Sequence, residues 1–404
     1  MSAFRRSDGY LLTVLTITSA MNWADRQVVP ILFPGIRAEL GLTDTELGII
    51  GGLAFSLIYA ITGFVFGVAA DRHMRVYVIA FGLTVWSLAT AAGAFVTGFQ
   101  SLFWARFFTG IGEASLFPCA ISLIGERFSA ESRGRALGIY GASAAVGAGL
   151  GIGLGGRIAE TLGWRQVFLL YGGVGLLLLP LVLSLPEERR MRTAEQHEPP
   201  LRVLGELLAD PRLLLVWLGG LLAIGSGLGF AAWTPSYFVR DRGLGVTETG
   251  AIFGAGALIG GIGGSVLGGM LADRRRVVHV AGALDVAWIS ALIAAPLLIL
   301  TINAVSPAAI AVLGLAGLVA VYAIFPALQT FMVSLVPKER HGLASALNVF
   351  FLGGIGSAIG PFVVGLVSDR TGSLHTAISV PAIGLVLATG LIVAAARLAR
   401  RPRL

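Results

Sequence analysis

The chain has 404 residues, of which 56% are hydrophobic and only 13% are charged, and its mean hydropathy is +0.85. This balance excludes an ordinary soluble globular domain and indicates an integral membrane protein. The net charge of +7 comes from arginines gathered in alternate loops, so we interpret it as a topology signal and as contact with anionic lipid headgroups, and we expect no nucleic-acid partner.

Runs of about 20 apolar residues, enough to cross a bilayer, recur along the whole chain. We predict twelve transmembrane helices, centred near residues 22, 57, 86, 112, 146, 174, 224, 260, 289, 319, 354 and 386. Most of the 29 lysines and arginines lie in loops on the side of the termini, which indicates that both termini are cytoplasmic. We therefore expect an all-α, multi-pass protein of the inner (plasma) membrane.

A cluster of charged residues interrupts two of the predicted spans. The first span carries Asn22, Asp25 and Arg26 in MNWADRQVV, and the fourth carries Arg106 and Glu113, seven residues apart and hence on one helix face. A charge at the centre of a span costs about 2.5–3.5 kcal/mol, so such residues normally face the protein interior or a wet cavity. The four formal charges sum to zero.

This cluster predicts proton-coupled binding of an anion. If Glu113 or Asp25 takes a proton, the cluster becomes net positive; when the proton leaves, the carboxylate competes with the anion for an arginine. We predict proton coupling at Glu113 and Asp25, with Asp25 alternatively the counter-ion of Arg26. Substrate contacts are predicted at Arg26, Arg106 and Asn22, and the two arginines could exchange roles. The alternative is that the ion pairs only hold helices one and four together.

An internal repeat divides the chain into halves. LGLTDTELG (40–48) and RGLGVTETG (242–250) match at five positions with an offset of 202 residues, and the register continues through the next helix. The polar stretch between the halves is rich in charge and proline and suits a cytoplasmic linker with a short surface helix over 201–209. We predict a first six-helix bundle over 1–188, a linker over 189–210 and a second bundle over 211–404.

Loop motifs carry a family resemblance. GVAADRHMR (67–75) resembles the cytoplasmic loop signature of the major facilitator superfamily, with Gly67, Asp71, Arg72 and Arg75 matching, and GGMLADRRR (268–276), which contains Asp273, resembles its degenerate copy. Four segments together resemble the Spinster family, and in particular a bacterial-type member of it: NWADRQ, LGLTDTELGIIGGLAFSLIYA, VWSLATA and RFFTGIGEAS. The resemblance implies two pseudo-symmetric six-helix bundles, alternating access and a substrate like lysophospholipid or sphingosine 1-phosphate.

The same resemblance implies cytoplasmic gates. Asp71 and Asp273 would each meet the N-terminal end of a helix in the opposite half, where Arg133 and Arg340 favour a carboxylate. The alternative is that these aspartates only cap their own loops.

The second half lacks a charge cluster, and no charged residue lies in its fourth helix. Aromatic residues take that place, and we predict that they line the substrate site: Phe230, Trp233, Tyr237, Tyr322 and Phe325. A polar half facing an apolar half suits an anionic amphiphile. The alternative is that these rings are interfacial anchors or face lipid. Gln329 and Asn348 are weaker candidates for cavity contacts.

The remaining motifs point away from enzyme chemistry. GAGLGIG follows no strand, and neither a Ser/His/Asp arrangement nor metal-ligand spacing occurs, so we expect no enzyme, no metal and no cofactor beyond the proton as coupling ion. Cys119 is expected to pack as a small apolar residue. We expect a monomer whose partners are membrane lipids and a small-molecule or lipid substrate. The alternative functions are transport of a small organic anion such as a sugar acid, and a non-transporting receptor or scaffold.

Overall fold

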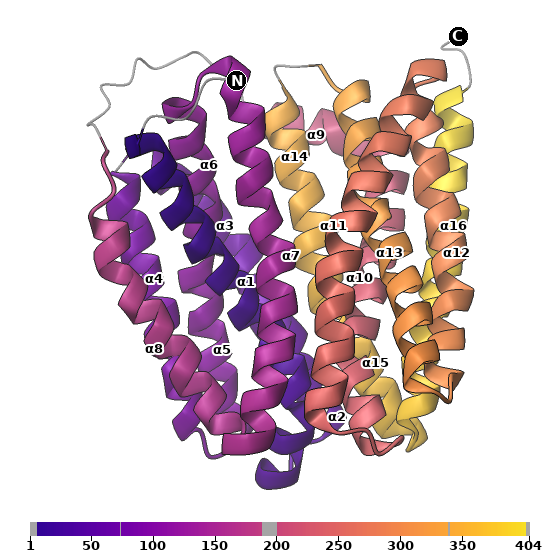
Figure 1. The fold of residues 1–404 in the computed structure, drawn as a ribbon. Coiled ribbons are helices and arrows are strands. Elements are labelled where there is room, and N and C mark those ends of the chain that lie inside the picture. Colours follow the sequence, from indigo (N-terminus) through magenta and orange to yellow (C-terminus); the bar gives the residue numbers. More distant parts are fainter. Residues whose placement is uncertain (1–5, 73, 188–199, 338–339, 401–404) are drawn as a thin grey trace. The chain divides into compact units, whose positions relative to one another are not determined.

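The computed structural model describes residues 6–72, 74–187, 200–337 and 340–400, and all regular structure within them is helical (Figure 1). Its packing divides the chain into two units. The first comprises Met1–Met191 and Phe238–Gly254, and the second comprises Arg192–Tyr237 and Ala255–Leu404. The end of one helix and the start of the next, over 238–254, thus pack with the first unit.

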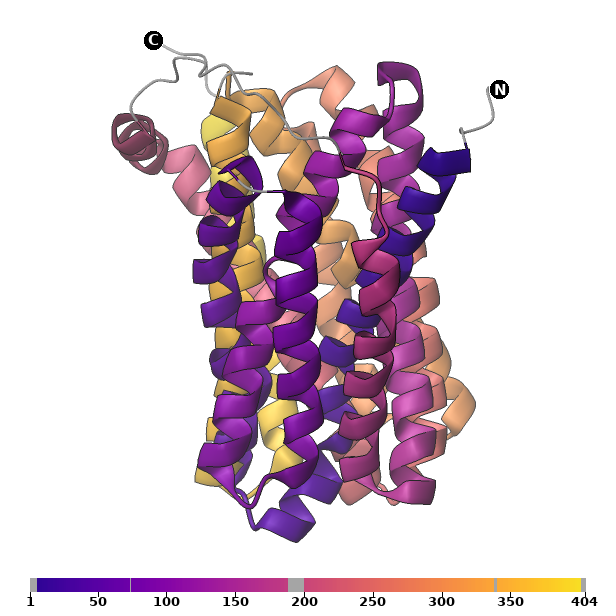
Figure 2. The ribbon, with the colours of Figure 1, turned by 90° about the vertical axis from the view of Figure 1, so that its left-hand side faces the viewer.

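The helices of the first half are α1 (Arg6–Leu40), α2 (Asp44–Gly48), η1 (Ile49–Leu53), α3 (Ala54–Arg72), α4 (Arg75–Ala92), η2 (Gly93–Phe95), α5 (Phe99–Glu113), α6 (Leu116–Arg127), α7 (Ala130–Leu162) and α8 (Trp164–Leu183). Those that follow are α9 (Pro200–Ala209), α10 (Pro211–Arg240), α11 (Val246–Val278), α12 (Gly282–Asn303), α13 (Pro307–Leu335), α14 (His341–Asn348), η4 (Val349–Gly356), α15 (Ser357–Thr371) and α16 (Leu374–Arg400). The predicted surface helix of the linker is α9, which is seen end-on in Figure 2 and runs across the direction of α10.

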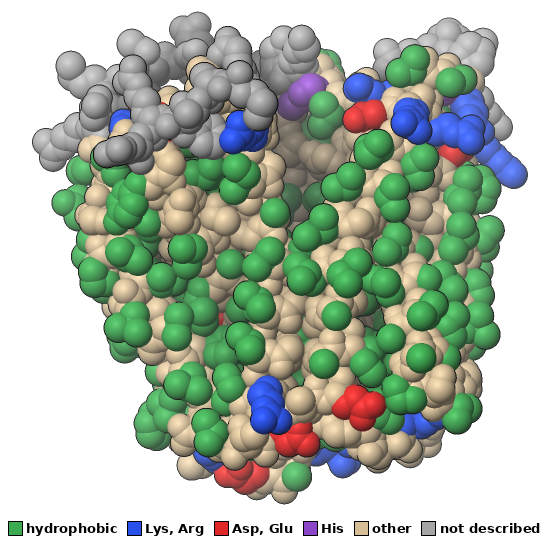
Figure 3. All heavy atoms as spheres, viewed as in Figure 1, with side chains coloured by type: hydrophobic (Ala, Val, Ile, Leu, Met, Phe, Trp, Pro, Cys, Tyr) green, Lys and Arg blue, Asp and Glu red, His purple; other side chains and the backbone are tan. Residues whose placement is uncertain are grey.

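The predicted fold class is confirmed. Eleven helices or runs of helices in the described residues are long and apolar enough to cross a membrane. The twelfth span is α1, whose 35 residues suffice in length but which carries the polar residues Asn22, Asp25 and Arg26. Hydrophobic side chains cover the flanks of the helices and charged ones gather at their ends (Figure 3). This distribution is what a hydrocarbon core with polar boundaries requires.

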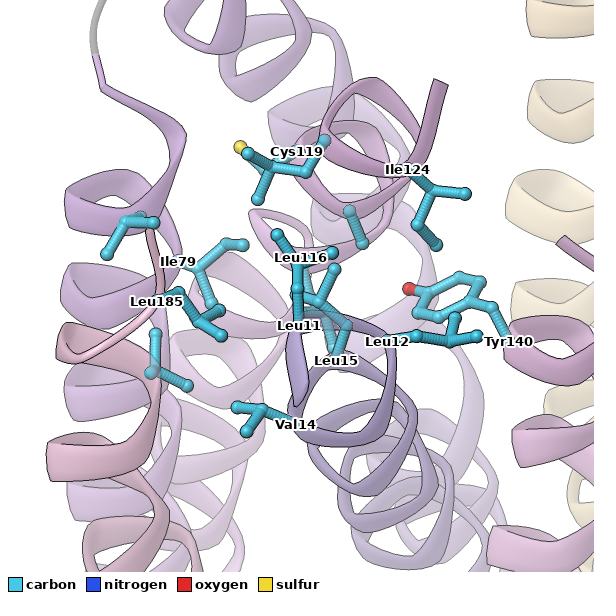
Figure 4. Packing of buried hydrophobic residues seen from close by; sticks show 14 of the residues in the cluster. Leu11, Leu12, Val14, Leu15, Ile79, Leu116, Cys119, Ile124, Tyr140 and Leu185 are labelled. Atoms are coloured by element: carbon cyan, nitrogen blue, oxygen red, sulfur yellow. The ribbon is translucent and has the colours of Figure 1, made fainter. Parts of the chain in front are cut away.

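A buried apolar cluster holds together the part of the first unit that lies around the N-terminal half of α1. Leu11 and Leu15 of α1 pack with Ile79 of α4 and with Leu116 and Cys119 of α6 (Figure 4). Cys119 is fully buried, so the prediction that it packs as a small apolar residue is confirmed.

Glycines let neighbouring helices approach closely. A Cβ atom added to Gly147 or Gly151 of α7 would lie 2.2 or 2.6 Å from a backbone oxygen of α1. In the second unit, a Cβ on Gly360 of α15 would lie 2.0 Å from the Gly225 oxygen of α10. Small residues thus join α7 to α1 and α15 to α10, as such residues do in membrane bundles.

The repeat also appears in the backbone. Gly41 follows α1 with a φ of 66°, and Gly243, its partner at an offset of 202 residues, follows α10 with a φ of 69°. Both positions are left-handed, where glycine carries no Cβ penalty. Gly41 directly follows the last residue of α1, and Gly243 lies three residues after that of α10.

Three predicted spans are not continuous α-helices, which the sequence analysis did not predict. The fourth span breaks after Glu113 into α5 and α6. The second and eleventh contain the π-helical segments η1 and η4. Such breaks and bulges often accompany functional sites, because they redirect side chains and free backbone groups.

Candidate functional site: a buried charge cluster in the first unit

Arg26 of α1 and Glu113 of α5 form an ion pair between the first and fourth spans. Arg26 donates from Nη2 and Nε to Oε2 of Glu113, at 3.0 and 3.3 Å. The Glu113 side chain is fully buried, and that of Arg26 is 19% exposed. A carboxylate buried in this way needs a partner, and Arg26 supplies it.

Asp25 has a different partner. Its Oδ2 accepts a hydrogen bond from the Thr90 hydroxyl of α4 at 2.5 Å, and the side chain is buried. The structure differs here from the expectation that Asp25 is the counter-ion of Arg26: consecutive residues of a helix point in different directions, and Arg26 turns to Glu113.

Arg106 is buried beside this ion pair but is not part of it. Although it lies two turns from Glu113 on α5, its Nε and Nη1 have no hydrogen-bond partner among the described residues. The same holds for Asn22 Nδ2, Asp25 Oδ1 and Glu113 Oε1. Buried polar atoms are nearly always paired, so this group of atoms is suited to a ligand or water.

Two glycines and a helix break explain why Glu113 reaches Arg26. A Cβ on Gly110 would lie 2.8 Å from the Phe55 oxygen, and one on Gly112 would lie 2.5 Å from the Trp86 nitrogen, so α5 packs closely on α3 and α4. α5 ends at Glu113, and the Ser115 hydroxyl donates to the Gly112 oxygen freed at that end. The sequence signal for this close packing was the motif GIGEAS, in which two glycines precede the embedded Glu113.

Aromatic rings surround Arg26, and none of them was among the predicted site residues. Its Cζ lies 4.6 Å from the ring centroid of Trp23, 4.8 Å from that of Phe55 and 4.3 Å from that of Tyr59. Trp23 lies three residues before Arg26 on α1, and Phe55 and Tyr59 are one turn apart on α3, but such spacings are ordinary in an apolar helix and do not single out rings next to a cation.

The predicted aromatic residues of the second half pack inside the second unit. Phe230 is buried, the Trp233 indole donates to the Pro361 oxygen at 2.8 Å, and the Tyr237 hydroxyl donates to the Ile302 oxygen at 3.1 Å. Tyr322 is half-buried and Phe325 is 37% exposed. These contacts give Trp233 and Tyr237 a role in helix packing.

The second unit also contains a chain of polar side chains at a π-helical turn. Gln329 of α13 donates from Nε2 to the Ser345 hydroxyl at 3.1 Å and accepts at Oε1 from Asn348 Nδ2 at 2.6 Å. Asn348 is fully buried, its Oδ1 has no partner among the described residues, and η4 begins at the next residue. The second unit is therefore less uniformly apolar than the sequence analysis supposed.

Of the predicted cytoplasmic residues, Arg75 lies in a network. It is buried, and it donates from Nε to Glu187 at 2.6 Å and from Nη1 to Glu126 at 2.5 Å. Glu187 also accepts from the backbone N–H groups of Arg75 and Val76 at the start of α4. A carboxylate at this position caps the helix and favours its dipole. The sequence analysis missed both glutamates.

The other predicted gate residues are spread over the helix ends. Gly67 is half-buried in α3 with open space at its Cβ, Arg133 is exposed and donates to the Phe128 oxygen, Asp273 is exposed, and Arg340 pairs with Glu206 of α9 at 2.7 Å. The side chains of Asp71 and Arg72 lie outside the part of the chain that the structure describes. Within the described ranges, no three His, Cys, Asp or Glu side chains come together as a metal site needs.

Comparison with known proteins identifies the family. The model described as Major Facilitator Superfamily matches residues 15–361. An MFS-type efflux pump of Mycolicibacterium smegmatis is 31% identical over 390 residues, which cover 95% of this chain and 89% of that protein. Protein spinster homolog 1 of Homo sapiens is 27% identical over 385 residues, covering 89% and 73% of the two chains.

Two further relatives extend this picture. The probable galactarate/D-glucarate transporter GarP of Escherichia coli is 27% identical over 404 aligned residues, covering 91% of this chain and 90% of that protein. The crystal structure of a bacterial homolog of the human lysosomal transporter Spinster, inward-facing and unoccupied, shares the fold with a TM-score of 0.88 at 22% identity and covers 98% of both chains. The chain therefore belongs to the Major Facilitator Superfamily and is a multi-pass membrane transporter homologous to the Spinster proteins.

Proposed function

We propose that this chain is a proton-coupled secondary transporter of an organic anion that works by alternating access. The observation that carries the proposal is the ion pair between Arg26 and the fully buried Glu113, with the buried Asp25 and Arg106 beside it. The unpartnered polar atoms of this cluster favour a ligand-binding role over a purely structural pair, because a structural network would satisfy them.

The coupling follows from competition for Arg26. While Glu113 is ionised, it occupies the N–H groups of Arg26 from which an anion would receive hydrogen bonds. A proton on Glu113 weakens that pair and leaves the cluster with one net positive charge, so proton and anion are bound together. Glu113 is the main proton carrier in this scheme. Asp25, held by Thr90, is the second.

Arg106 supplies the second cationic contact. Its buried, unpartnered N–H groups can donate to an anion without first breaking a bond within the protein. A guanidinium binds a carboxylate or phosphate through paired N–H groups, which suits either substrate class below. Asn22 adds a neutral donor.

An anionic amphiphile such as a lysophospholipid is the first substrate candidate. We propose that the charge cluster binds its headgroup and that the aromatic residues of the second half contact its chain: Phe230, Trp233, Tyr237, Tyr322 and Phe325. This assignment rests on the absence of charged residues from α13 and on the relatedness to Spinster proteins.

A small organic anion such as a sugar acid is the second candidate. The polar chain of Gln329, Ser345 and Asn348 favours it, since a polyhydroxylated substrate needs polar contacts on both sides. The relatedness to a probable galactarate/D-glucarate transporter supports the same class.

The cytoplasmic residues are proposed as gates. The group comprises Gly67, Asp71, Arg72, Arg75, Asp273, Arg133 and Arg340. Support comes from the buried network of Arg75 with Glu126 and Glu187, which ties α4 and α6 to the end of α8. We further propose a monomer in the inner (plasma) membrane with both termini cytoplasmic, no cofactor, and the proton as its coupling ion.

The test is transport by purified protein in liposomes under an imposed pH gradient. Palmitoyl lysophosphatidate and D-glucarate are offered separately, and accumulation is compared with and without the gradient. Gradient-driven accumulation of one of them supports the proposal and selects the substrate class. Binding without movement of either would instead indicate a non-transporting receptor.

A further inference from the structure

The guanidinium of Arg26 lies in a box of three aromatic rings that no part of the proton-coupling scheme has used. Trp23 comes from α1, and Phe55 and Tyr59 come from α3, with all three ring centroids 4.3–4.8 Å from Arg26 Cζ. Phe55 and Tyr59 stack on each other at 5.7 Å with an interplanar angle of 19°. Rings at these distances attract a cation through their quadrupoles, most strongly where water is excluded.

The Phe55 ring contacts both arginines. Its ring centroid lies 4.8 Å from Arg26 Cζ and 4.8 Å from Arg106 Cζ, and its side chain is buried. Its backbone is fixed as well, because α5 packs against the Phe55 carbonyl at Gly110, and η1 ends two residues before Phe55. One ring thus contacts the two cations that would bind an anion.

The box and the ion pair act on Arg26 independently. Glu113 is the ion-pair partner of Arg26 in the described residues, and a proton on Glu113 removes that charge. A long arginine side chain released from its partner would gain rotamer freedom and lose its alignment. The rings carry no titrating carboxylate, so their attraction for Arg26 persists.

The charged and titratable groups around this site are few. They are Arg26 and Asp25 on α1, Tyr59 on α3, Arg106 and Glu113 on α5, Tyr140 on α7 near Tyr59, and Tyr171 on α8 near Asp25. From α4 the site receives Thr90, which does not titrate. Protonation of Glu113 therefore changes the charge next to Arg26 and leaves the three rings unchanged.

We propose that Trp23, Phe55 and Tyr59 hold Arg26 in its anion-binding position while Glu113 carries a proton, with Phe55 also setting the position of Arg106. They are positioning residues: the carboxylate switches the charge of the site, and the rings keep its geometry. This inference rests on the proposed function, because it assigns the rings a task only if Glu113 is protonated during the cycle.

The test compares Phe55→Leu, which keeps an apolar side chain and removes the ring, with Phe55→Tyr, which keeps the ring. Binding of palmitoyl lysophosphatidate and of D-glucarate is measured by calorimetry in detergent at acidic and at alkaline pH. Neutral monopalmitoylglycerol reports on losses unrelated to charge. The matched control is Phe168→Leu, since Phe168 is an equally buried ring of the first unit that contacts Trp164 and no cation in the described residues.

We expect Phe55→Leu to weaken binding of the anion about tenfold at acidic pH and about twofold or less at alkaline pH, where ionised Glu113 holds Arg26. In a Glu113→Gln background the loss should be about tenfold at both pH values. Phe55→Tyr should bind as wild type does. If Phe55→Leu does not fold, the half-buried Tyr59→Leu is measured in the same way.

Three results would overturn the inference: an equal loss at both pH values, a Phe55→Tyr variant as weak as Phe55→Leu, or the same pH-selective loss in Phe168→Leu. Failure of the proposed function itself is recognised separately. In that case the anion affinity of the wild-type protein does not change with pH.

Discussion

At the scale of single residues, the site is decided by which carboxylate meets which guanidinium. Asp25 and Arg26 are neighbours in sequence, yet Arg26 pairs with Glu113, 87 residues away, and Asp25 pairs with Thr90. This pairing gives the two acids different roles, because only Glu113 competes directly with an anion for Arg26. Two substitutions test this division.

Arg26 should contribute to binding of the charged headgroup of the ligand and not to binding of its chain. Arg26→Ala should weaken binding of lysophosphatidate by about 1.5–3 kcal/mol, or roughly ten- to a hundredfold, since charged hydrogen bonds of this strength are lost. Arg26→Lys should recover only part, because an ammonium lacks the planar fork. Calorimetry with lysophosphatidate and neutral monopalmitoylglycerol measures both variants, and Arg157→Ala, at an exposed arginine, is the control. Equal losses for the two ligands would mean that Arg26 stabilises the fold.

Glu113→Gln should abolish proton-driven accumulation and leave substrate binding largely intact. The amide matches the carboxyl group in size, so the packing is kept, but the side chain carries no charge and no longer takes up a proton. Uptake into liposomes with and without a pH gradient measures the loss, and Glu248→Gln, at an exposed glutamate in the first turn of α11, serves as control. Accumulation that still follows the gradient would remove Glu113 from the mechanism.

At the scale of elements, helix ends and helix crossings place these residues. The break after Glu113 ends α5 inside the predicted fourth span, and the crossings of α5 with α3 and α4 are close enough to need glycine. Sequence periodicity indicated where the spans lie, but a broken span and a continuous one have the same hydropathy.

The crossing of α4 and α5 should be sensitive to a single methyl group. A Cβ on Gly112 would lie 2.5 Å from the Trp86 nitrogen and 2.6 Å from the Gly82 oxygen. Both are backbone atoms, which cannot move aside by a change of side-chain rotamer. We expect Gly112→Ala to lower stability by about 1–3 kcal/mol. Thermal unfolding in detergent measures it. Gly125→Ala in α6, with nothing within 4 Å of its added Cβ, should be neutral or slightly stabilising. A Gly112→Ala protein as stable as Gly125→Ala would contradict the close crossing.

The start of α10 should depend on pH through Asp210. Burial alone would raise the pKa of Asp210, but hydrogen bonds and charge from Arg212 outweigh it and hold the pKa below its ordinary value of 3.8. Since the folded-state pKa is depressed, the stabilisation is present above the ordinary value and lost as the pH falls through the folded-state pKa.

We expect Asp210→Ala to cost about 1 kcal/mol at neutral pH, as loss of a helix cap does, and the difference from wild type to shrink only below about pH 4. Thermal unfolding in detergent across the pH range measures it, with Asp273→Ala at an exposed aspartate for comparison. A difference that shrinks already at neutral pH would show that another group is responsible.

At the scale of the whole molecule, transport requires that binding of the proton and the anion be linked. An anion that binds only the folded protein raises its stability by about 2.7 kcal/mol at a concentration of 100 Kd. We expect the increase in unfolding temperature with lysophosphatidate or D-glucarate to be larger at acidic than at alkaline pH. In Glu113→Gln the increase should be the same at both pH values. A wild-type increase that does not change with pH would argue against linkage.

The predictions from sequence succeeded where local composition decides the outcome. Apolar runs indicated the spans, the motifs indicated the family, and the cost of embedded charge indicated that Asn22, Asp25, Arg26, Arg106 and Glu113 form a group. The amide chain at Gln329 and Asn348 was noted only as a weaker candidate. The rings around Arg26 were missed because aromatic residues are ordinary in an apolar helix, and nothing in their spacing distinguishes a ring next to a cation from one facing lipid.

The sequence by itself determined that the chain is helical, crosses the membrane many times and repeats its architecture, because the bilayer accepts only long apolar segments whose backbone groups bond internally. It also determined that the charges within the first and fourth spans lie inside the protein. Only the tertiary structure decided how those charges are paired. Whether Arg26 meets Asp25 or Glu113 depends on the rotation of α1, the glycine crossings of α5 and the break after Glu113, which bring together residues from four spans. A distance of a few ångströms between side chains is set by this packing, and no single segment encodes it.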